Sequence, residues 1–197
     1  MPRLKSGKRR EDILQSLVRI LEQHQGERVT TAMLAEAVGV SEAALYRHFP
    51  SKRKMYEALI EFVEETLFTR INRIVAEETD TALRIHQIMV LILGFAEKNP
   101  GITRLLKGDV LMGEARDLQE RISQMFDRLE TQFKQVLREG ELRHEVQPPV
   151  SESARLLLAM AEGLISQYVR SGFRDKPMSD WDGQWTVLSR TLFLSAV

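Results

Sequence analysis

The segment between positions 30 and 52 gathers hydroxyl, basic and aromatic side chains in a pattern that can bind a nucleic acid. The candidate contact residues are Thr30, Thr31, Ser41, Ala43, Tyr46, Arg47, His48 and Lys52. Hydroxyl groups and cations bind phosphate oxygens, an arginine also reaches a guanine edge, and an alanine methyl can meet that of thymine. These residue types therefore favour double-stranded DNA as the ligand.

The remaining reactive side chains do not form the pattern of a catalytic or metal site. The histidines are scattered along the chain, at His24, His48, His86 and His144. They include no HExxH pair, and no phosphate-cradling glycine loop or nucleophile elbow is present. The absence of cysteine excludes disulfides and thiolate metal ligands. A row of glutamates, Glu61, Glu64 and Glu65, is typical of a solvated helix face. We expect no enzyme, no cofactor and no metal.

Two short helices joined by a tight turn are expected to position the DNA-binding side chains. Thr30 can cap the first helix and Ser41 the second, because their hydroxyls accept hydrogen bonds from first-turn amides. Gly39 suits the turn between them, and Pro50 ends the second helix, SEAALYRHF. This spacing is that of a helix-turn-helix, which lays its second helix in the major groove.

That second helix should have two faces. Leu45 and Phe49 lie four residues apart, so they are expected to pack on the core. The opposite face would present Ala43, Tyr46 and Arg47 to the solvent or to DNA. A helix-turn-helix also occurs in helical proteins that do not bind DNA, so the outward face is the observation on which this interpretation depends.

The helical period dominates the rest of the chain, and the predicted fold class is all-α. Further helices are expected over about residues 13–21, 51–78, 82–98, 102–107, 118–138, 151–171 and 181–196, with a loop over 140–150. The fourth helix is long enough to bridge two domains. No run with a period of two indicates a strand.

Charge is divided unevenly along the chain. Residues 1–54 contain 11 Lys and Arg against 6 Asp and Glu, a net charge of +5, and the remainder contains 17 against 22, a net charge of −5. A basic head suits a polyanion. We expect a DNA-binding domain over 1–54 and a helical domain for dimerisation and partner binding over 55–197. Lys5, Lys8, Arg9 and Arg10 could form a mobile arm along the DNA. The basic N-terminus lacks a signal peptide and no apolar run suits a membrane span, so a cytoplasmic protein is expected.

The segment VTTAMLAEAVGVSEAALYRHFPSKRKMYEALI resembles the DNA-binding domain of the TetR family. The residues that carry the resemblance are Thr31, Leu34, Ala35, Gly39, Val40, Leu45, Tyr46, Phe49 and Lys52. It implies a three-helix DNA-binding head, a larger helical body and a homodimer that reads palindromic DNA. More than one dimer can share such a site.

The resemblance also implies that the last two helices form the dimer interface. Apolar residues available for it are Leu156, Leu157, Met160, Leu164 and Tyr168, with Trp185, Leu188, Leu192 and Phe193. The alternative is that these faces pack inside one chain.

Similarity to one branch of the family, the nucleoid occlusion factors, continues through ILQSL, LIEFVEETLFTRIN, LGFAEKNPGITRLLKGDVLM and KQVLRE. It implies a protein that associates with the nucleoid and, on DNA, binds the C-terminal tail of the tubulin-like division protein FtsZ. The matching partner-binding positions are Phe62, Arg70, Leu91, Gly94, Lys98 and Asn99. Lys98 stands where better-known relatives have arginine, and it keeps the charge but not the planar fork.

Simpler roles for these positions are open. Phe62 and Leu91 can be core residues, Gly94 can serve helix packing, and Arg70 can pair with Glu65 or Glu77. A different function is open as well, that of a ligand-responsive repressor. Its pocket would be lined by Met89, Phe95, Met125, Phe126 and Trp185.

Overall fold

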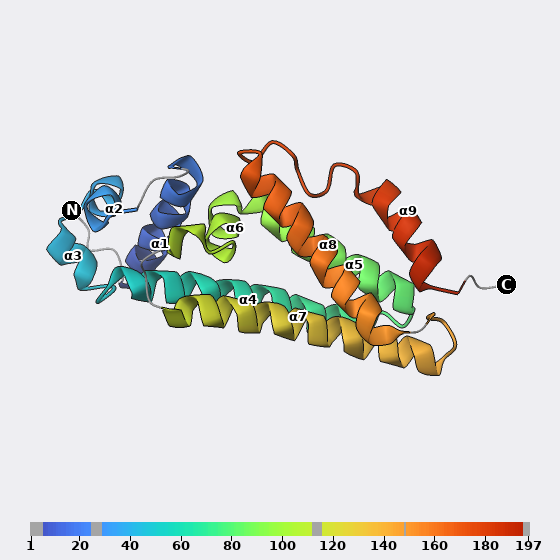
Figure 1. Ribbon diagram of the computed structural model, residues 1–197. Coiled ribbons are helices and arrows are strands. Elements are labelled where there is room, and N and C mark those ends of the chain that lie inside the picture. Colours follow the sequence, from blue (N-terminus) through green and yellow to red (C-terminus); the bar gives the residue numbers. More distant parts are fainter. Residues whose placement is uncertain (1–5, 25–28, 112–115, 148, 195–197) are drawn as a thin grey trace. The chain divides into compact units, whose positions relative to one another are not determined.

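The computed structural model describes residues 6–24, 29–111, 116–147 and 149–194 (Figure 1). Across these ranges the chain is helical without a named strand, which confirms the predicted all-α fold class. The elements are α1 (Ser6–Gln23), α2 (Thr31–Val38), α3 (Glu42–Tyr46), α4 (Lys52–Glu77), α5 (Thr81–Lys98), α6 (Pro100–Leu106), the 3-10 turn η1 (Asp109–Leu111), α7 (Arg116–Leu142), α8 (Val150–Arg170) and α9 (Trp181–Leu192).

The chain divides into two compact units. Unit 1 comprises residues 1–63 and 99–122, and unit 2 comprises residues 64–98 and 123–197. Unit 1 thus joins the helix-turn-helix to α6, a helix that follows it by about fifty residues. The functional boundary expected between residues 54 and 55 stays a prediction, because these units reflect packing and not function.

Helix α6 is fixed to α1 by direct backbone contact and by a buried arginine. A Cβ added to Gly101 would lie 2.0 Å from the Val18 carbonyl oxygen, so only glycine permits this approach. The Arg104 guanidinium donates to the carbonyls of Leu21, at 3.0 Å, and His24, at 2.5 Å. Leu21 lies in the last turn of α1 and His24 directly follows the helix, so Arg104 binds carbonyl groups at the C-terminal end of α1.

In unit 2, α5 packs against α8 (Figure 1). The Tyr168 hydroxyl donates to the Glu97 carbonyl at 3.1 Å, which links these two helices. Trp181, at the start of α9, is buried and donates through its indole nitrogen to His86 Nε2 at 3.1 Å. His86 therefore accepts at Nε2, which holds α9 on α5.

Helix α7 extends past Gly140, where the sequence predicted a loop. A Cβ at Gly140 would lie 2.6 Å from the Thr81 side chain and 2.7 Å from the Val146 side chain. Glycine costs a helix about 1 kcal/mol relative to alanine. Here it lets the helix pass close to its neighbours, so Gly140 is a packing residue and the predicted loop begins too early.

The last helix ends at Leu192 instead of continuing to about 196. Phe193 adopts extended angles, with φ −114° and ψ 142°, and forms an isolated antiparallel bridge with Val146. Two hydrogen bonds of 2.9 Å complete the bridge. The Gln147 amide donates to the Leu192 carbonyl, and the Leu194 amide donates to the Glu145 carbonyl. This pairing holds Phe193 in an extended conformation, so α9 does not continue for another turn. Residues 195 and 196 of the predicted helix lie outside the described residues.

Helix α1 begins at Ser6, so Lys8, Arg9 and Arg10 lie on a helix and not on a mobile arm. The prediction of an arm was wrong for these three, because the helix starts well before the first apolar residue of its periodic face. Lys5 lies outside the described residues.

Part of the apolar surface predicted for a dimer is instead buried within the single chain. The buried members are Leu157, Tyr168, Leu188, Leu192 and Phe193. The alternative of packing inside one chain is therefore right for these residues. Leu156 is half exposed, and Met160, Leu164 and Trp185 are partly exposed.

Candidate nucleic-acid interface

The helix-turn-helix has the predicted caps. Thr30 Oγ1 accepts from the Met33 amide at 3.2 Å, and Ser41 Oγ accepts from the Ala44 amide at 3.2 Å. Both capping residues are extended and exposed. Gly39 adopts the left-handed conformation, φ 70° and ψ 41°, as the tight turn requires.

Helix α3 presents the two faces expected from its sequence. Leu45 and Phe49 are buried, with exposed fractions of 0% and 1%. Ala43, Tyr46 and Arg47 are exposed. The helix itself ends at Tyr46, earlier than predicted, but the Phe49 amide still donates to the Leu45 carbonyl at 3.1 Å and keeps the helical course.

A contact missed at the sequence level joins α2 to α3. The Thr31 hydroxyl donates to Glu42 Oε2 at 2.8 Å. Thr31 was predicted as a phosphate contact, and in the structure its proton orients an acidic side chain on the first turn of α3. Only the fold shows this pair, because the two residues lie eleven positions apart.

Lys52 and His48 also have structural partners. The Lys52 ammonium donates to the Val29 carbonyl at 3.0 Å and lies 5.7 Å from the centre of the Tyr56 ring. It therefore anchors the start of α4 to the segment before α2. His48 is partly buried, and its carbonyl accepts from the Arg10 guanidinium at 3.2 Å.

Arg10 links α1 to the end of the helix-turn-helix. Its guanidinium carbon lies 4.2 Å from the centre of the Phe49 ring, a cation–π distance, in addition to its hydrogen bond with His48. The sequence placed Arg10 on an arm, so this role went unrecognised.

The first two turns of α4 carry a cluster of opposite charges. Ser51 Oγ accepts from the Lys54 amide at 3.2 Å and caps the helix. Glu57 accepts from Lys54 at 2.5 Å and from Arg53 at 2.9 Å. The hydrogen bond from Lys54, aided by Arg53, holds the pKa of Glu57 below its ordinary value of 4.5. Arg53 also pairs with Asp117.

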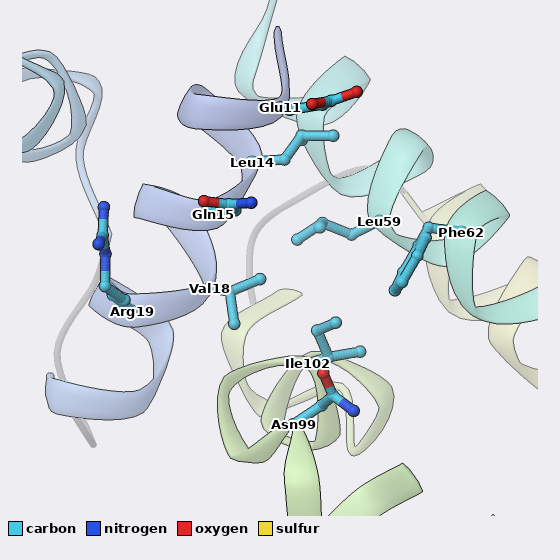
Figure 2. A pocket seen from close by; sticks show the side chains of 9 residues that line it. All are labelled: Glu11, Leu14, Gln15, Val18, Arg19, Leu59, Phe62, Asn99 and Ile102. Carbon is cyan, nitrogen blue, oxygen red and sulfur yellow. The ribbon is translucent and has the colours of Figure 1, made fainter. Parts of the chain in front are cut away.

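A hollow of about 460 Å³ lies within unit 1, between α1, α4 and α6. Its walls are mostly apolar, and its lining residues are Glu11, Leu14, Gln15, Val18, Arg19, Leu59, Phe62, Asn99 and Ile102. Figure 2 shows the side chains of Leu14, Val18, Leu59 and Ile102 converging on it, with Phe62 at its far side. Phe62 and Asn99, two predicted partner-binding residues, thus share one hollow.

Phe62 is not a core residue, since 48% of its surface is exposed. The other four predicted partner residues belong to unit 2. Arg70 and Lys98 are exposed there, and Leu91 is partly exposed. A Cβ on Gly94 would meet no atom within 4 Å, so chain packing does not explain this glycine.

The ion pairs suggested as a simpler role for Arg70 are not formed. Glu77 pairs with Arg73 at 2.8 Å, and within the described ranges Arg70 makes no salt bridge with Glu65 or Glu77. Arg70 is thus an exposed residue of α4 that forms neither of these pairs.

Within the described ranges, no group of three histidine, aspartate or glutamate residues is placed to hold a metal ion. No helix in that part of the chain combines the length and apolarity needed to cross a membrane. None of the residues suggested for a repressor's ligand pocket lines the hollow of unit 1.

Two family models match the chain. Residues 13–59 match the bacterial regulatory proteins of the tetR family, and residues 79–193 match the SlmA-like form of the tetracyclin repressor-like C-terminal domain. The second match alone covers more than half of the chain. The likeness thus extends from the DNA-binding head into the body.

Curated relatives and solved structures agree with these models. Nucleoid occlusion factor SlmA from a Marinomonas species is 57% identical over 97% of this chain and 98% of the relative. That of Alteromonas mediterranea is 55% identical over 96% and 98%. A TetR transcription regulator from Haloarcula marismortui has a TM-score of 0.79 at 18% identity, covering 95% of this chain and all of that one. The MbdR regulator from Azoarcus sp. CIB has a TM-score of 0.81 at 17% identity, covering 94% and 100%.

The structural likeness at such low identity shows the fold alone. Identity above 50% over nearly the whole length shows closer kinship, and it covers the body as well as the DNA-binding head. The chain belongs to the TetR family of DNA-binding regulators, in the branch of the nucleoid occlusion factors named SlmA.

Proposed function

We propose that this protein is a nucleoid occlusion factor that binds palindromic chromosomal DNA and, when bound, engages FtsZ and antagonises assembly of the division ring over the nucleoid. The observation that carries this proposal is the exposed face of α3 in a chain whose whole length matches SlmA proteins. The protein acts as a regulator in the cytoplasm and not as an enzyme.

In this proposal α3 enters the major groove. Ala43 approaches the bases, Arg47 contacts a guanine edge or a phosphate, and Tyr46 donates to a phosphate. Thr30, Thr31, Ser41, His48 and Lys52 flank this helix and contribute phosphate contacts. Thr31 contributes its phosphate contact while its hydroxyl donates to Glu42, and Lys52 does so while its ammonium donates to the Val29 carbonyl.

The proposed partner site binds the FtsZ C-terminal tail through six residues. These are Phe62, Arg70, Leu91, Gly94, Lys98 and Asn99. The exposed aromatic ring of Phe62 offers an apolar anchor, and the exposed cations Arg70 and Lys98 suit an acidic peptide. The open space beside Gly94 permits a close backbone approach.

A homodimer places two copies of α3 on the two halves of a palindrome. Its interface would use the part of α8 that remains accessible, where Leu156, Met160 and Leu164 recur at intervals of four residues. Ala159 and Gly163 lie between them, and a Cβ on Gly163 would meet nothing within 4 Å. Small residues at such a position allow two helices to approach closely.

Chromosomal footprinting combined with FtsZ sedimentation tests the proposal. Binding sites spread over the chromosome, and FtsZ disassembly that requires site-bearing DNA, are expected. An Arg70→Glu variant should keep its DNA affinity and lose its effect on FtsZ. A single site beside one promoter, released by a small metabolite, would instead support a ligand-responsive repressor.

A further inference from the structure

We propose that Glu42 is a specificity-determining residue for DNA. Its carboxylate, held in place by Thr31, accepts a hydrogen bond from the amino group of a cytosine in the major groove. This inference rests on the proposed function and deepens it, because it assigns the base that one side chain of α3 selects. The contact residues proposed above include no acidic side chain.

The first support is the position of Glu42 on the exposed side of α3. Glu42 is exposed, as are Ala43, Tyr46 and Arg47, whereas Leu45 is buried. Glu42 lies four residues before Tyr46, so the two side chains share one side of the helix. In a helix-turn-helix, the first residues of the second helix contact the edges of the bases. Glu42 is the first residue of α3, and this docking geometry therefore predicts a base contact for it.

The second support is the hydrogen bond that orients the carboxylate. The Thr31 hydroxyl donates to Glu42 Oε2 at 2.8 Å. Within the described ranges this is the hydrogen bond that the Glu42 side chain makes, so its Oε1 atom can accept from a second donor. Because Thr31 already orients the side chain, less conformational entropy is lost when that second hydrogen bond forms.

The third support is the negative charge of Glu42 within a basic head. Residues 1–54 contain 11 Lys and Arg against 6 Asp and Glu. The phosphates of DNA repel a carboxylate, so Glu42 weakens binding to any sequence that offers it no hydrogen-bond donor. Cytosine presents its N4 amino group without an acceptor on the same base edge, whereas adenine presents the N7 acceptor beside its amino group. Cytosine is therefore the base that suits this carboxylate.

Selection of binding sequences from a library of random duplexes by the full-length protein tests the proposal. The wild type should select a cytosine at one position of each half-site, and Glu42→Gln should relax that preference. Glutamine keeps an oxygen that accepts from Thr31, but its amide suits the N6 donor and N7 acceptor of adenine. The preference for cytosine over adenine should fall by about fivefold or more at that position, while the rest of the selected sequence stays the same.

Glu36→Gln is the matched control, because it removes the same charge from the helix-turn-helix. Glu36 is exposed on α2 and lies five residues after Thr31, about 140° around the helix. This variant should select the same sequence as the wild type. Affinity for a duplex of scrambled sequence should rise by about twofold or more in Glu42→Gln, and by less in Glu36→Gln, because repulsion between charges falls with distance.

Thr31 is a positioning residue in this proposal, and its own phosphate contact can be separated from that role. Thr31→Val removes the hydroxyl and should relax the preference at the same base pair as Glu42→Gln. Thr31→Ser keeps a hydroxyl and should restore the preference for cytosine. Loss of a phosphate contact alone would weaken binding to all sequences about equally and leave the selected sequence unchanged.

The outcomes separate this inference from the proposed function. If the wild type selects a palindrome and Glu42→Gln selects it with the same preference at every position, Glu42 reads no base and the inference fails, while the proposed function stands. A lower melting temperature of Glu42→Gln with unchanged preferences would show that the carboxylate only stabilises α3, and a relaxed position other than a C·G pair would also overturn the inference. If the wild type selects no sequence, the proposed function fails and this inference with it.

Discussion

Arg47 and Tyr46 are the side chains on which direct reading of DNA depends. Arg47→Ala and Tyr46→Ala should each weaken binding to the specific duplex by about 10- to 100-fold, because a base or phosphate contact is worth about 1–3 kcal/mol. The measurement is fluorescence anisotropy at physiological salt, with sedimentation to show that the dimer is intact. Arg138→Ala removes an exposed arginine from α7 and serves as the control. Unchanged affinity in the two α3 variants would refute the docking model.

Glu57, near the start of α4, gives the stability of the fold a dependence on pH. Its folded-state pKa lies below the ordinary value of 4.5, so its ion pairs stabilise the fold above about pH 4.5 and lose this effect as the pH falls through the lower pKa. Since the pairs lie near the surface, the contribution should be less than about 1 kcal/mol. Urea unfolding should show Glu57→Gln slightly less stable than the wild type at pH 7, and this difference should shrink as the pH falls through the lowered pKa of Glu57. A difference that does not change with pH would assign the effect to packing.

At the scale of elements, the close contact of α6 with α1 predicts a strong effect at Gly101. Gly101→Ala places a methyl 2.0 Å from the Val18 carbonyl and should destabilise the protein by about 2 kcal/mol or more, because backbone must shift. Gly183→Ala, in α9, meets no atom within 4 Å and should stabilise by about 0.5–1 kcal/mol. Denaturant unfolding compares the two. Equal effects would show that α6 can move away from α1 at little cost.

Arg10 connects α1 to the residues that follow α3. Arg10→Ala removes both the stack on Phe49 and the hydrogen bond to His48, so α3 should be held less firmly and DNA affinity should fall by about fivefold or more. Lys8→Ala removes an equal charge from the same helix and should cost less. Anisotropy over a range of salt concentrations separates the two effects, since only a phosphate contact changes the salt slope. Equal losses of DNA affinity in the two variants would show that Arg10 contributes only its positive charge.

The sequence predicted these elements well where local chemistry decides them. Thr30, Ser41 and Gly39 specify their caps and turn within a few residues, and Leu45 and Phe49 define the buried face of α3 by spacing alone. The prediction from the sequence failed where contacts with residues distant in the chain determine where a helix ends. Gly140 continues a helix because Thr81 and Val146 lie against it, and Phe193 leaves a helix because Val146 pairs with it.

The candidate site likewise contains features that local sequence predicts and features that depend on distant contacts. The exposure of Ala43, Tyr46 and Arg47 followed from helical periodicity. The pair of Thr31 and Glu42, and the grouping of Phe62 with Asn99, join residues far apart in the chain. No local sequence pattern predicts contacts between residues that lie far apart in the chain, so only the folded structure shows them.

At the scale of the whole molecule, dimerisation sets the geometry of DNA binding. Leu156 on α8 and Leu83 on α5 are exposed to 50% and 49%. Leu156→Glu should convert the dimer to a monomer, because a charge within an apolar interface is not compensated. Leu83→Glu should leave the dimer intact. Sedimentation velocity distinguishes the two. A dimer that survives Leu156→Glu would place the interface elsewhere.

The hydrogen bonds from Arg104 to the end of α1 limit how this DNA-binding head can be grafted onto another protein body. A fragment cut after the first fifty or so residues would leave behind the guanidinium that satisfies Leu21 and His24, and the glycine that seats against Val18. A working chimera would have to bring residues 100–106 along with the head, although they come from the middle of the chain.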